Sequence, residues 1–246
     1  MKSYKLIPMV LLFALASCKK DKPVKETSTP VQFVTTDYSY LGTYDDSGRP
    51  NLAQKDVLTA ELKNYVTTSL PEKGDISKTR PEYLKNADLV IPKTSDVFIT
   101  FTSEGTGFTN SVGYYLYKTG SSPVKPADID KIIYIFPNAS SNKGGTLRPG
   151  DKVYLGTIEA GMSIGFVLLE KGWDSVAKAV NKNAPHYCSN QALNPEDNVL
   201  LKPHTVLFDY PAENKTIIGF EDTNRTLASC DHDFNDVVIY ATVVTK

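Results

Sequence analysis

The stretch KTIIGFEDTNRTLASCDHDFNDVVIYATVV, residues 215–244, contains two apolar runs that flank a polar, acidic segment. Both runs are short and rich in Ile, Val, Phe and Tyr, which is typical of β-strands. Their spacing predicts the two arms of one hairpin, with residues 223–230 as the connection. The acidic residues then lie at the mouth of the hairpin, where the two strands end.

Six similar runs precede this hairpin at fairly even intervals, separated by Gly, Pro, Asn and Asp. Only residues 56–70, which are followed by Pro71, carry apolar residues at helical spacing. We therefore predict a mainly β fold, an antiparallel β-sandwich of jelly-roll-like type with one or two short helices. The six runs are residues 96–105, 111–120, 128–138, 151–158, 162–173 and 205–210.

Composition limits the classes of function. The chain has 246 residues, 41% of them hydrophobic, and a formal net charge of -1. This is enough apolar material for one sizeable core, so we expect a single domain over residues 31–246. A phosphate-binding domain usually carries a basic excess, so we expect no nucleic-acid partner.

The N-terminus has the pattern of an export signal. Lys2 and Lys5 precede a short apolar run, and LASC ends it with small residues before Cys18. This pattern resembles the lipobox of bacterial lipoproteins and predicts a signal peptide over residues 1–17, a lipid on Cys18 and a flexible tether over residues 18–30. The alternative is an ordinary secretory signal in which Cys18 merely follows the cleavage site.

The expected location follows from that signal. Removal of residues 1–17 takes away two of the 27 basic residues and none of the 28 acidic ones. A mildly acidic chain gains little from anionic lipid, so the membrane partner would be reached through the acyl chains on Cys18. We expect an exported protein, lipid-anchored to the outer membrane of a Gram-negative bacterium and exposed at the cell surface.

The hairpin mouth is the strongest candidate site. Asp231, Asp233 and Asn235 alternate along the chain, so their oxygens can converge on a hard cation. Ca²⁺ accepts six to eight oxygen ligands in flexible geometry, whereas Mg²⁺ demands a stricter octahedron. The alternative is a solvated acidic turn whose Asp side chains cap backbone N–H groups. The predicted Ca²⁺ ligands are Glu221, Asp222, Asp231, Asp233, Asn235 and Asp236.

This motif begins like an EF-hand loop, D-x-D-x-N, but departs from it. The sixth position is Asp236 instead of Gly, and the twelfth is Thr242 instead of Glu. The segment also leads into a predicted strand. We therefore expect a different metal site, one that orders the loop and braces the last strand without performing chemistry.

Two cysteines remain after Cys18, and three states were compatible with them. Cys188 and Cys230 invite a disulfide in an exported domain. Free thiols are the second state. A tetrahedral zinc site is the third, because His186 and His232 each lie two residues from a cysteine. The sequence favours the disulfide.

Signals for catalysis are weaker. GMSIG, residues 161–165, matches G-x-S-x-G around Ser163, but a strand-like run follows it where a nucleophile elbow needs a helix. Paired carboxylates for glycoside hydrolysis are available, although no spacing places two of them face to face. We expect no enzyme, and a hydrolase is the alternative. The available glutamates are Glu104, Glu159, Glu170 and Glu196.

The C-terminal stretch IIGFEDTNRTLASCDHDFNDVVIYATV, together with FTSEGTGFTNSVGYYLYK, IFPNAS, LRPGDKVYLG and SIGFVLLEKGW, resembles the bacterial domain-of-unknown-function family 4114. The resemblance covers roughly residues 95–246. It implies an exported or surface-located, calcium-associated β domain, often found beside adhesion-like modules and without an established enzymatic activity. Cys230 departs from the polar or small residue expected before the acidic motif.

Together these patterns predict a lipid-anchored cell-envelope or surface β-sandwich with a calcium-binding acidic loop. It would act as a non-enzymatic binding or adhesion module, with a glycan or a surface protein as its partner. The alternative is a small carbohydrate-active or other hydrolase built on the same sandwich.

Overall fold

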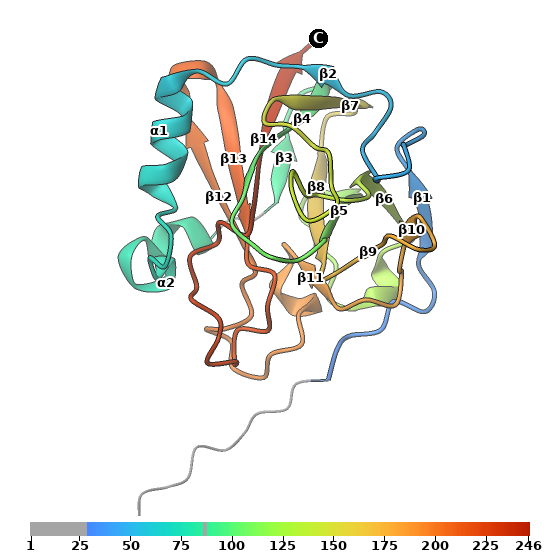
Figure 1. Ribbon diagram of the computed structural model, residues 1–246, viewed down its shortest axis with the longest axis vertical. Coiled ribbons are helices and arrows are strands. Elements are labelled where there is room, and N and C mark those ends of the chain that lie inside the picture. Colours follow the sequence, from blue (N-terminus) through green and yellow to red (C-terminus); the bar gives the residue numbers. More distant parts are fainter. Residues whose placement is uncertain (1–28, 86–87) are drawn as a thin grey trace, which may run out of the picture.

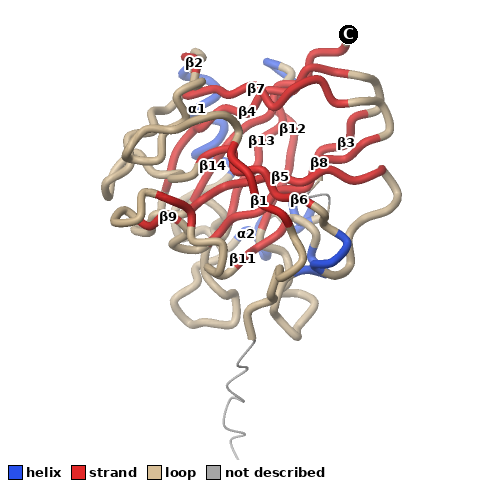
Figure 2. Tube along the Cα trace, turned by 90° about the vertical axis from the view of Figure 1, so that its right-hand side faces the viewer, coloured by secondary structure: helices blue, strands red, loops and turns tan. Residues whose placement is uncertain are grey.

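A computed structural model describes residues 29–85 and 88–246. Its strands form two sheets and a short two-stranded ribbon (Figure 1). In the view turned by 90°, the strands occupy the centre of the molecule and long loops extend from the end away from the C-terminus (Figure 2). The predicted signal peptide, Cys18 and most of the tether lie outside the described residues.

The first sheet has the order β1-β6-β5-β8-β11, and β3 also pairs with β8. Every printed pairing in it is antiparallel except β1 with β6, which is parallel. The strands of this sheet are β1 (Asp37–Tyr40), β3 (Leu89–Ile91), β5 (Ser111–Lys118), β6 (Lys131–Phe136), β8 (Met162–Leu169) and β11 (His186–Cys188).

The second sheet has the order β12-β13-β14-β4-β7-β2 and is antiparallel throughout. Because β2 belongs to this sheet and β1 to the other, the segment before residue 95 contributes to both. Its strands are β2 (Gln54–Lys55), β4 (Ser95–Glu104), β7 (Asp151–Ile158), β12 (Thr205–Tyr210), β13 (Lys215–Phe220) and β14 (Val237–Thr245), and the separate ribbon pairs β9 (Trp173–Asp174) with β10 (Ala179–Val180).

Two α-helices lie against the second sheet. Helix α1 begins after Thr59, whose side chain accepts a hydrogen bond from the Leu62 N–H at 3.1 Å and so caps the first turn. The helices are α1 (Ala60–Ser69) and α2 (Ile76–Thr79), and the 3₁₀ turns are η1 (Pro81–Leu84), η2 (Pro126–Asp128), η3 (Gln191–Leu193) and η4 (Pro211–Glu213).

The side chains of β14 alternate between two apolar cores, one on each face of the second sheet. Val237, Ile239 and Ala241 point into the core between the two sheets, whereas Val238 and Tyr240 point into a second core under α1. Successive side chains of a strand face opposite sides of the sheet, so one apolar run serves both cores. A third apolar cluster covers the outer face of the first sheet, around Tyr115 and Tyr134.

The predicted mainly β sandwich is confirmed, and each of the eight predicted strand runs contains a strand. The predicted helix is also present, but it starts at Ala60 instead of residue 56, because Thr59 provides the cap. The sequence missed the shortest strands, such as β2 and β11, which are two or three residues long. Within the described residues, no helix has the length and apolar composition needed to cross a bilayer.

Candidate metal centre

The acidic loop joins β13 to β14. Phe220 pairs with Val237 at the end of the hairpin, so Glu221 directly follows one strand and Asp236 directly precedes the other. The predicted hairpin is therefore present. The loop, dark red in Figure 1, lies beside α2, where the Ile76 N–H donates to the His232 carbonyl oxygen at 2.9 Å.

Phe234 anchors the loop to the core under α1. Its side chain is fully buried, and the Arg225 guanidinium lies 4.9 Å from the centre of its ring. His232 and Phe234 both have left-handed backbone, with φ of 62° and 57°. Such angles are uncommon for bulky residues and require support from the surrounding packing. The burial of Phe234 supplies that support. Asp231 and Asp233, the neighbours of His232 in the chain, lie together in a group of carboxylates.

An outer group of carboxylates forms where the loop meets the end of α1. Glu72, Asp231 and Asp233 each bring an oxygen within 4.8 Å of the other two. The Asn235 side-chain N–H₂ lies 2.9 Å from Asp233 Oδ2 and 3.4 Å from Glu72 Oε2. The backbone N–H of Lys73 donates to Asp233 at 2.8 Å. Glu72 and Asp231 are exposed and Asp233 is buried, so the group opens to solvent on one side.

An inner group lies at the strand ends. Glu221 and Asp222 are each only 2% exposed. The Asp222 N–H donates to Asp236 Oδ2 at 2.9 Å, and Asn110 donates to Asp222 Oδ2 at 2.6 Å. Glu221 Oε2, by contrast, has no hydrogen-bond partner. A buried carboxylate oxygen without a partner is costly, and the bond from the Cys230 thiol to the Glu221 carboxyl offsets only part of that cost.

The two groups influence each other electrostatically. Burial raises the pKa of Glu221 to about 7, and the nearby charges of Asp231 and Asp233 add to the shift. Burial, followed by the charges of Asp222 and Glu221, raises the pKa of Asp236 to about 10. Burial also raises the pKa of Asp233. These shifts indicate carboxylates that the fold brings together without enough positive charge.

Arg225 is the buried cation of this region. Its guanidinium donates to the Pro203 carbonyl oxygen at 2.7 Å and to His232 Nδ1 at 3.2 Å. Its charge is also attracted to Glu221. One guanidinium that is occupied by a carbonyl and an imidazole cannot balance two groups of carboxylates.

A buried pair fixes the backbone beneath the inner group. His204 Nε2 lies 2.9 Å from Glu196 Oε1, and both side chains are fully buried. His204 Nδ1 lies 3.0 Å from the backbone oxygen of Glu221, and the Arg225 N–H donates to Glu196 Oε1 at 3.3 Å. The pair thus holds both ends of the segment that begins the loop.

The chemistry of this site is that of oxygen ligands. Carboxylates, an amide and backbone groups suit a hard divalent cation, and Ca²⁺ tolerates irregular geometry with mixed exposed and buried ligands. Asn235 presents its N–H₂ to Glu72 and Asp233, so it would join a ligand set by turning its amide to present Oδ1. The orphaned Glu221 Oε2 and the unbalanced charge both fit a bound cation.

The structure divides the predicted ligands between the two groups. Asp231 and Asp233 lie in the outer group with Glu72, and Asn235 bridges two of these carboxylates through its nitrogen. Glu221, Asp222 and Asp236 form the inner group. The sequence missed Glu72, which stands in the polar PEKG that follows α1. No local pattern distinguishes it, because its role depends on the packing of α1 against the hairpin.

The expected Cys188–Cys230 disulfide is wrong for this structure, in which both cysteines are free. Cys188 lies fully buried on β11 within the apolar cluster of the first sheet. Cys230 lies in the acidic loop, with its sulfur 3.1 Å from His232 Nδ1. The two thiols therefore belong to different surroundings. Burial raises the pKa of both thiols, which keeps them protonated and unreactive.

The zinc alternative is not assembled either. His186 Nε2 bonds the Tyr38 hydroxyl at 3.0 Å and its Nδ1 lies 2.8 Å from the Ala184 oxygen. Both ring nitrogens of His186 are thus engaged away from the loop that holds Cys230 and His232.

The remaining catalytic candidates form hydrogen bonds with neighbouring groups of the fold. Ser163 lies within β8, and its hydroxyl is 2.8 Å from that of Thr119, so no nucleophile elbow is present at this position. Glu104 accepts hydrogen bonds from the Ser141 and Asn142 backbone N–H groups at 3.1 Å each. Glu170 bonds Tyr187, and Glu159 bonds Thr94.

The comparison with known families concerns the part of the chain that contains the hairpin. Residues 158–243 match the family model of the domain of unknown function DUF4114. No curated protein and no solved structure matches the chain. The DUF4114 match includes the whole acidic loop but not Glu72, so the outer carboxylate group combines residues from inside and outside the matched segment.

Proposed function

We propose that this protein is a lipid-anchored, cell-surface β-sandwich whose acidic loop binds Ca²⁺, and that it acts as a non-enzymatic binding or adhesion module. The observation that carries the calcium proposal is Glu221 Oε2, a buried carboxylate oxygen without a partner beside four other carboxylates, those of Asp222, Asp231, Asp233 and Asp236. A divalent cation removes the repulsion among them and satisfies that oxygen.

The ion would order the loop and would not carry out chemistry. Asp231 and Asp233 belong to the loop and Glu72 follows α1, so a shared ion would tie the hairpin to the helix. The nearby thiol of Cys230 is kept protonated by burial, and Ser163 lies in a different sheet. These surroundings support a binding module over a hydrolase.

The lipid anchor rests on the sequence pattern at residues 1–18, with Cys18 as the acylated residue. An anchor at one end of the chain would leave the sandwich free to present a surface to a glycan or to another surface protein. In this proposal the lipid on Cys18 attaches the protein to the membrane, and the folded domain binds the glycan or surface protein.

Thermal melts of the full-length protein test the calcium proposal. At a Ca²⁺ concentration about 100 times the dissociation constant, binding to the folded state alone adds about 2.7 kcal/mol of stability. We expect the melting temperature to be higher in Ca²⁺ than in EDTA, and the Asp231→Ala, Asp233→Ala double variant to lose this difference.

The matched control replaces two exposed aspartates elsewhere, Asp37→Ala with Asp197→Ala, and should keep the calcium response. If wild-type protein melts at the same temperature in EDTA and in Ca²⁺, the carboxylates form a solvated acidic turn.

A further inference from the structure

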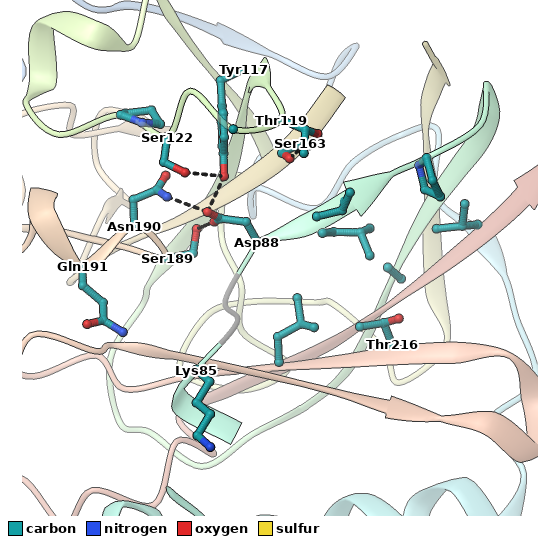
Figure 3. Close-up of a pocket in the computed structure, with 18 of the residues that line it drawn as sticks. Lys85, Asp88, Tyr117, Thr119, Ser122, Ser163, Ser189, Asn190, Gln191 and Thr216 are labelled. Carbon is teal, nitrogen blue, oxygen red and sulfur yellow. Dashed lines mark hydrogen bonds between the residues drawn. The ribbon is translucent and has the colours of Figure 1, made fainter. Parts of the chain in front are cut away.

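A cleft of about 1030 Å³ lies between the two sheets, away from the acidic loop. One wall is formed by β3, the ends of β5 and β8, and the turn after β11. The other wall is formed by β12, β13 and β14. Figure 3 shows Asp88 and Asn190 on the first wall and Thr216 on the second. The volume is at the upper end of the range of small-molecule sites, which is about 300–1,000 Å³.

The first wall presents polar groups in a fixed arrangement. Asp88 accepts hydrogen bonds from the Tyr117 hydroxyl and the Asn190 amide, each at 2.5 Å, and from the Ser189 hydroxyl. Asn190 in turn accepts from the buried Tyr115 hydroxyl at 2.5 Å. Because each side chain is held by another, the carboxylate, amide and phenol keep their positions without a ligand (Figure 3).

The first wall also carries a pair of hydroxyls, and the second wall is partly apolar. The hydroxyls of Thr119 and Ser163 lie 2.8 Å apart on the same side. Opposite them, Leu207 and Val243 provide aliphatic surface. Thus one side of the cleft offers hydrogen-bonding groups and the other offers apolar contact.

A cleft with hydrogen-bonding groups on one wall and apolar surface on the other matches the chemistry of a sugar. A sugar ring carries hydroxyls on its edge and C–H groups on its faces, and a carboxylate, an amide and hydroxyls can both accept from and donate to those hydroxyls. An anionic ligand would meet two carboxylates, Asp88 and Asp209, against one lysine, Lys85, in the described lining of the cleft. A cation would meet an oxygen pair that three neutral donors already occupy.

We propose that this cleft binds a short, neutral oligosaccharide, held by the Asp88–Asn190 wall and by the hydroxyls of Thr119 and Ser163. The inference deepens the proposed role as a binding module and is independent of the calcium site, because the cleft contains none of its carboxylates.

Calorimetric titration of the full-length protein with maltotriose, mannotriose, xylotriose and triacetylchitotriose tests the proposal. At least one sugar should give saturable heat and should be recovered uncleaved. Thr216→Trp, which fills the cleft, should weaken binding at least about tenfold, equivalent to about 1.4 kcal/mol. The control Thr68→Trp, on the exposed face of α1, should bind as wild type does.

A milder variant tests the polar wall without filling the cleft. Thr119→Val keeps the shape of an exposed side chain and removes one hydroxyl, so we expect affinity to fall by roughly threefold to tenfold, as for one lost hydrogen bond. Absence of saturable heat with all four sugars would overturn the proposal. So would wild-type affinity in either cleft variant, a cleaved sugar, or tight binding of an extended peptide instead.

Calcium titration without sugar, and sugar titration in EDTA, separate this proposal from the calcium site. Sugar binding that persists in EDTA supports the cleft whatever the calcium result. Calcium binding without any sugar binding leaves the metal site intact and contradicts the cleft proposal.

Discussion

At the scale of single residues, this chain places several titratable groups where water cannot reach them. His186 is the clearest case outside the acidic loop. It is 3% exposed, stacks on Phe33 with ring centres 4.5 Å apart, and has both nitrogens engaged by Tyr38 and Ala184. Burial lowers its pKa from 6.5 to about 4. The folded state therefore holds His186 neutral.

This predicts a loss of stability in acid. A histidine whose pKa is lower in the folded state contributes its full stability above pH 6.5, and the contribution is lost as the pH falls toward 4. At a pH of about 5 the loss should be about 2 kcal/mol. His186→Gln, which stays neutral, should not show it.

The measurement is the free energy of unfolding by urea at pH 7 and pH 5, for wild type and His186→Gln. Carboxylates titrate in both proteins, so the difference between the two proteins isolates the histidine. Equal pH dependence in the two would show that His186 is not responsible.

The sequence predicted the loop residues of the candidate metal site but missed the glutamate that follows α1. Asp231, Asp233 and Asn235 were predicted to lie together because their alternation is a local pattern, and the structure brings Asp231 and Asp233 into one group of carboxylates. Glu72 was not found, because a glutamate after a helix is usually solvated and only the packing of α1 brings it to the loop. The disulfide failed for a related reason: composition suggests a pairing, but the fold separates Cys188 from Cys230.

At the scale of elements, strand period was the reliable signal. The long strands were predicted because their apolar residues form continuous or alternating runs, as in β14. Strands such as β1 and β3 were missed because three or four residues carry too little pattern, and their pairing is decided by neighbours distant in sequence. The parallel pairing of β1 with β6 could not be predicted for the same reason.

The contact between the end of β4 and the acidic loop gives an element-scale prediction. A Cβ on Gly105 would lie 2.1 Å from Asn235 Oδ1, whereas a Cβ on Gly107 meets nothing within 4 Å. Gly105→Ala should therefore displace Asn235 and weaken Ca²⁺ binding by about tenfold, which is about 1.4 kcal/mol.

Gly107→Ala is the matched control and should bind Ca²⁺ as wild type does. Titration calorimetry of the two variants gives the comparison. If Gly105→Ala binds as tightly as Gly107→Ala, Asn235 has no part in the metal site.

At the scale of the whole molecule, we propose that a lipid anchor and a bound cation complement the β-sandwich. If Cys18 is acylated as we propose, the protein should fractionate with membranes and Cys18→Ser should release it into the soluble fraction, because the acyl chains would supply the attachment. Immunoblots of separated membrane and soluble fractions check this. Membrane association that survives the substitution would mean that the folded domain or an uncleaved signal holds the protein there.

The central claim is that the hairpin loop and the end of α1 together hold a calcium ion. Calorimetric titration of Ca²⁺ into the full-length protein tests it most directly when wild type is compared with Glu72→Ala and with Glu61→Ala, an exposed glutamate at the other end of the same helix. We predict saturable binding in wild type and Glu61→Ala, and binding weakened at least about tenfold in Glu72→Ala. Absence of calcium binding in wild type, or equal affinity in all three proteins, would contradict it.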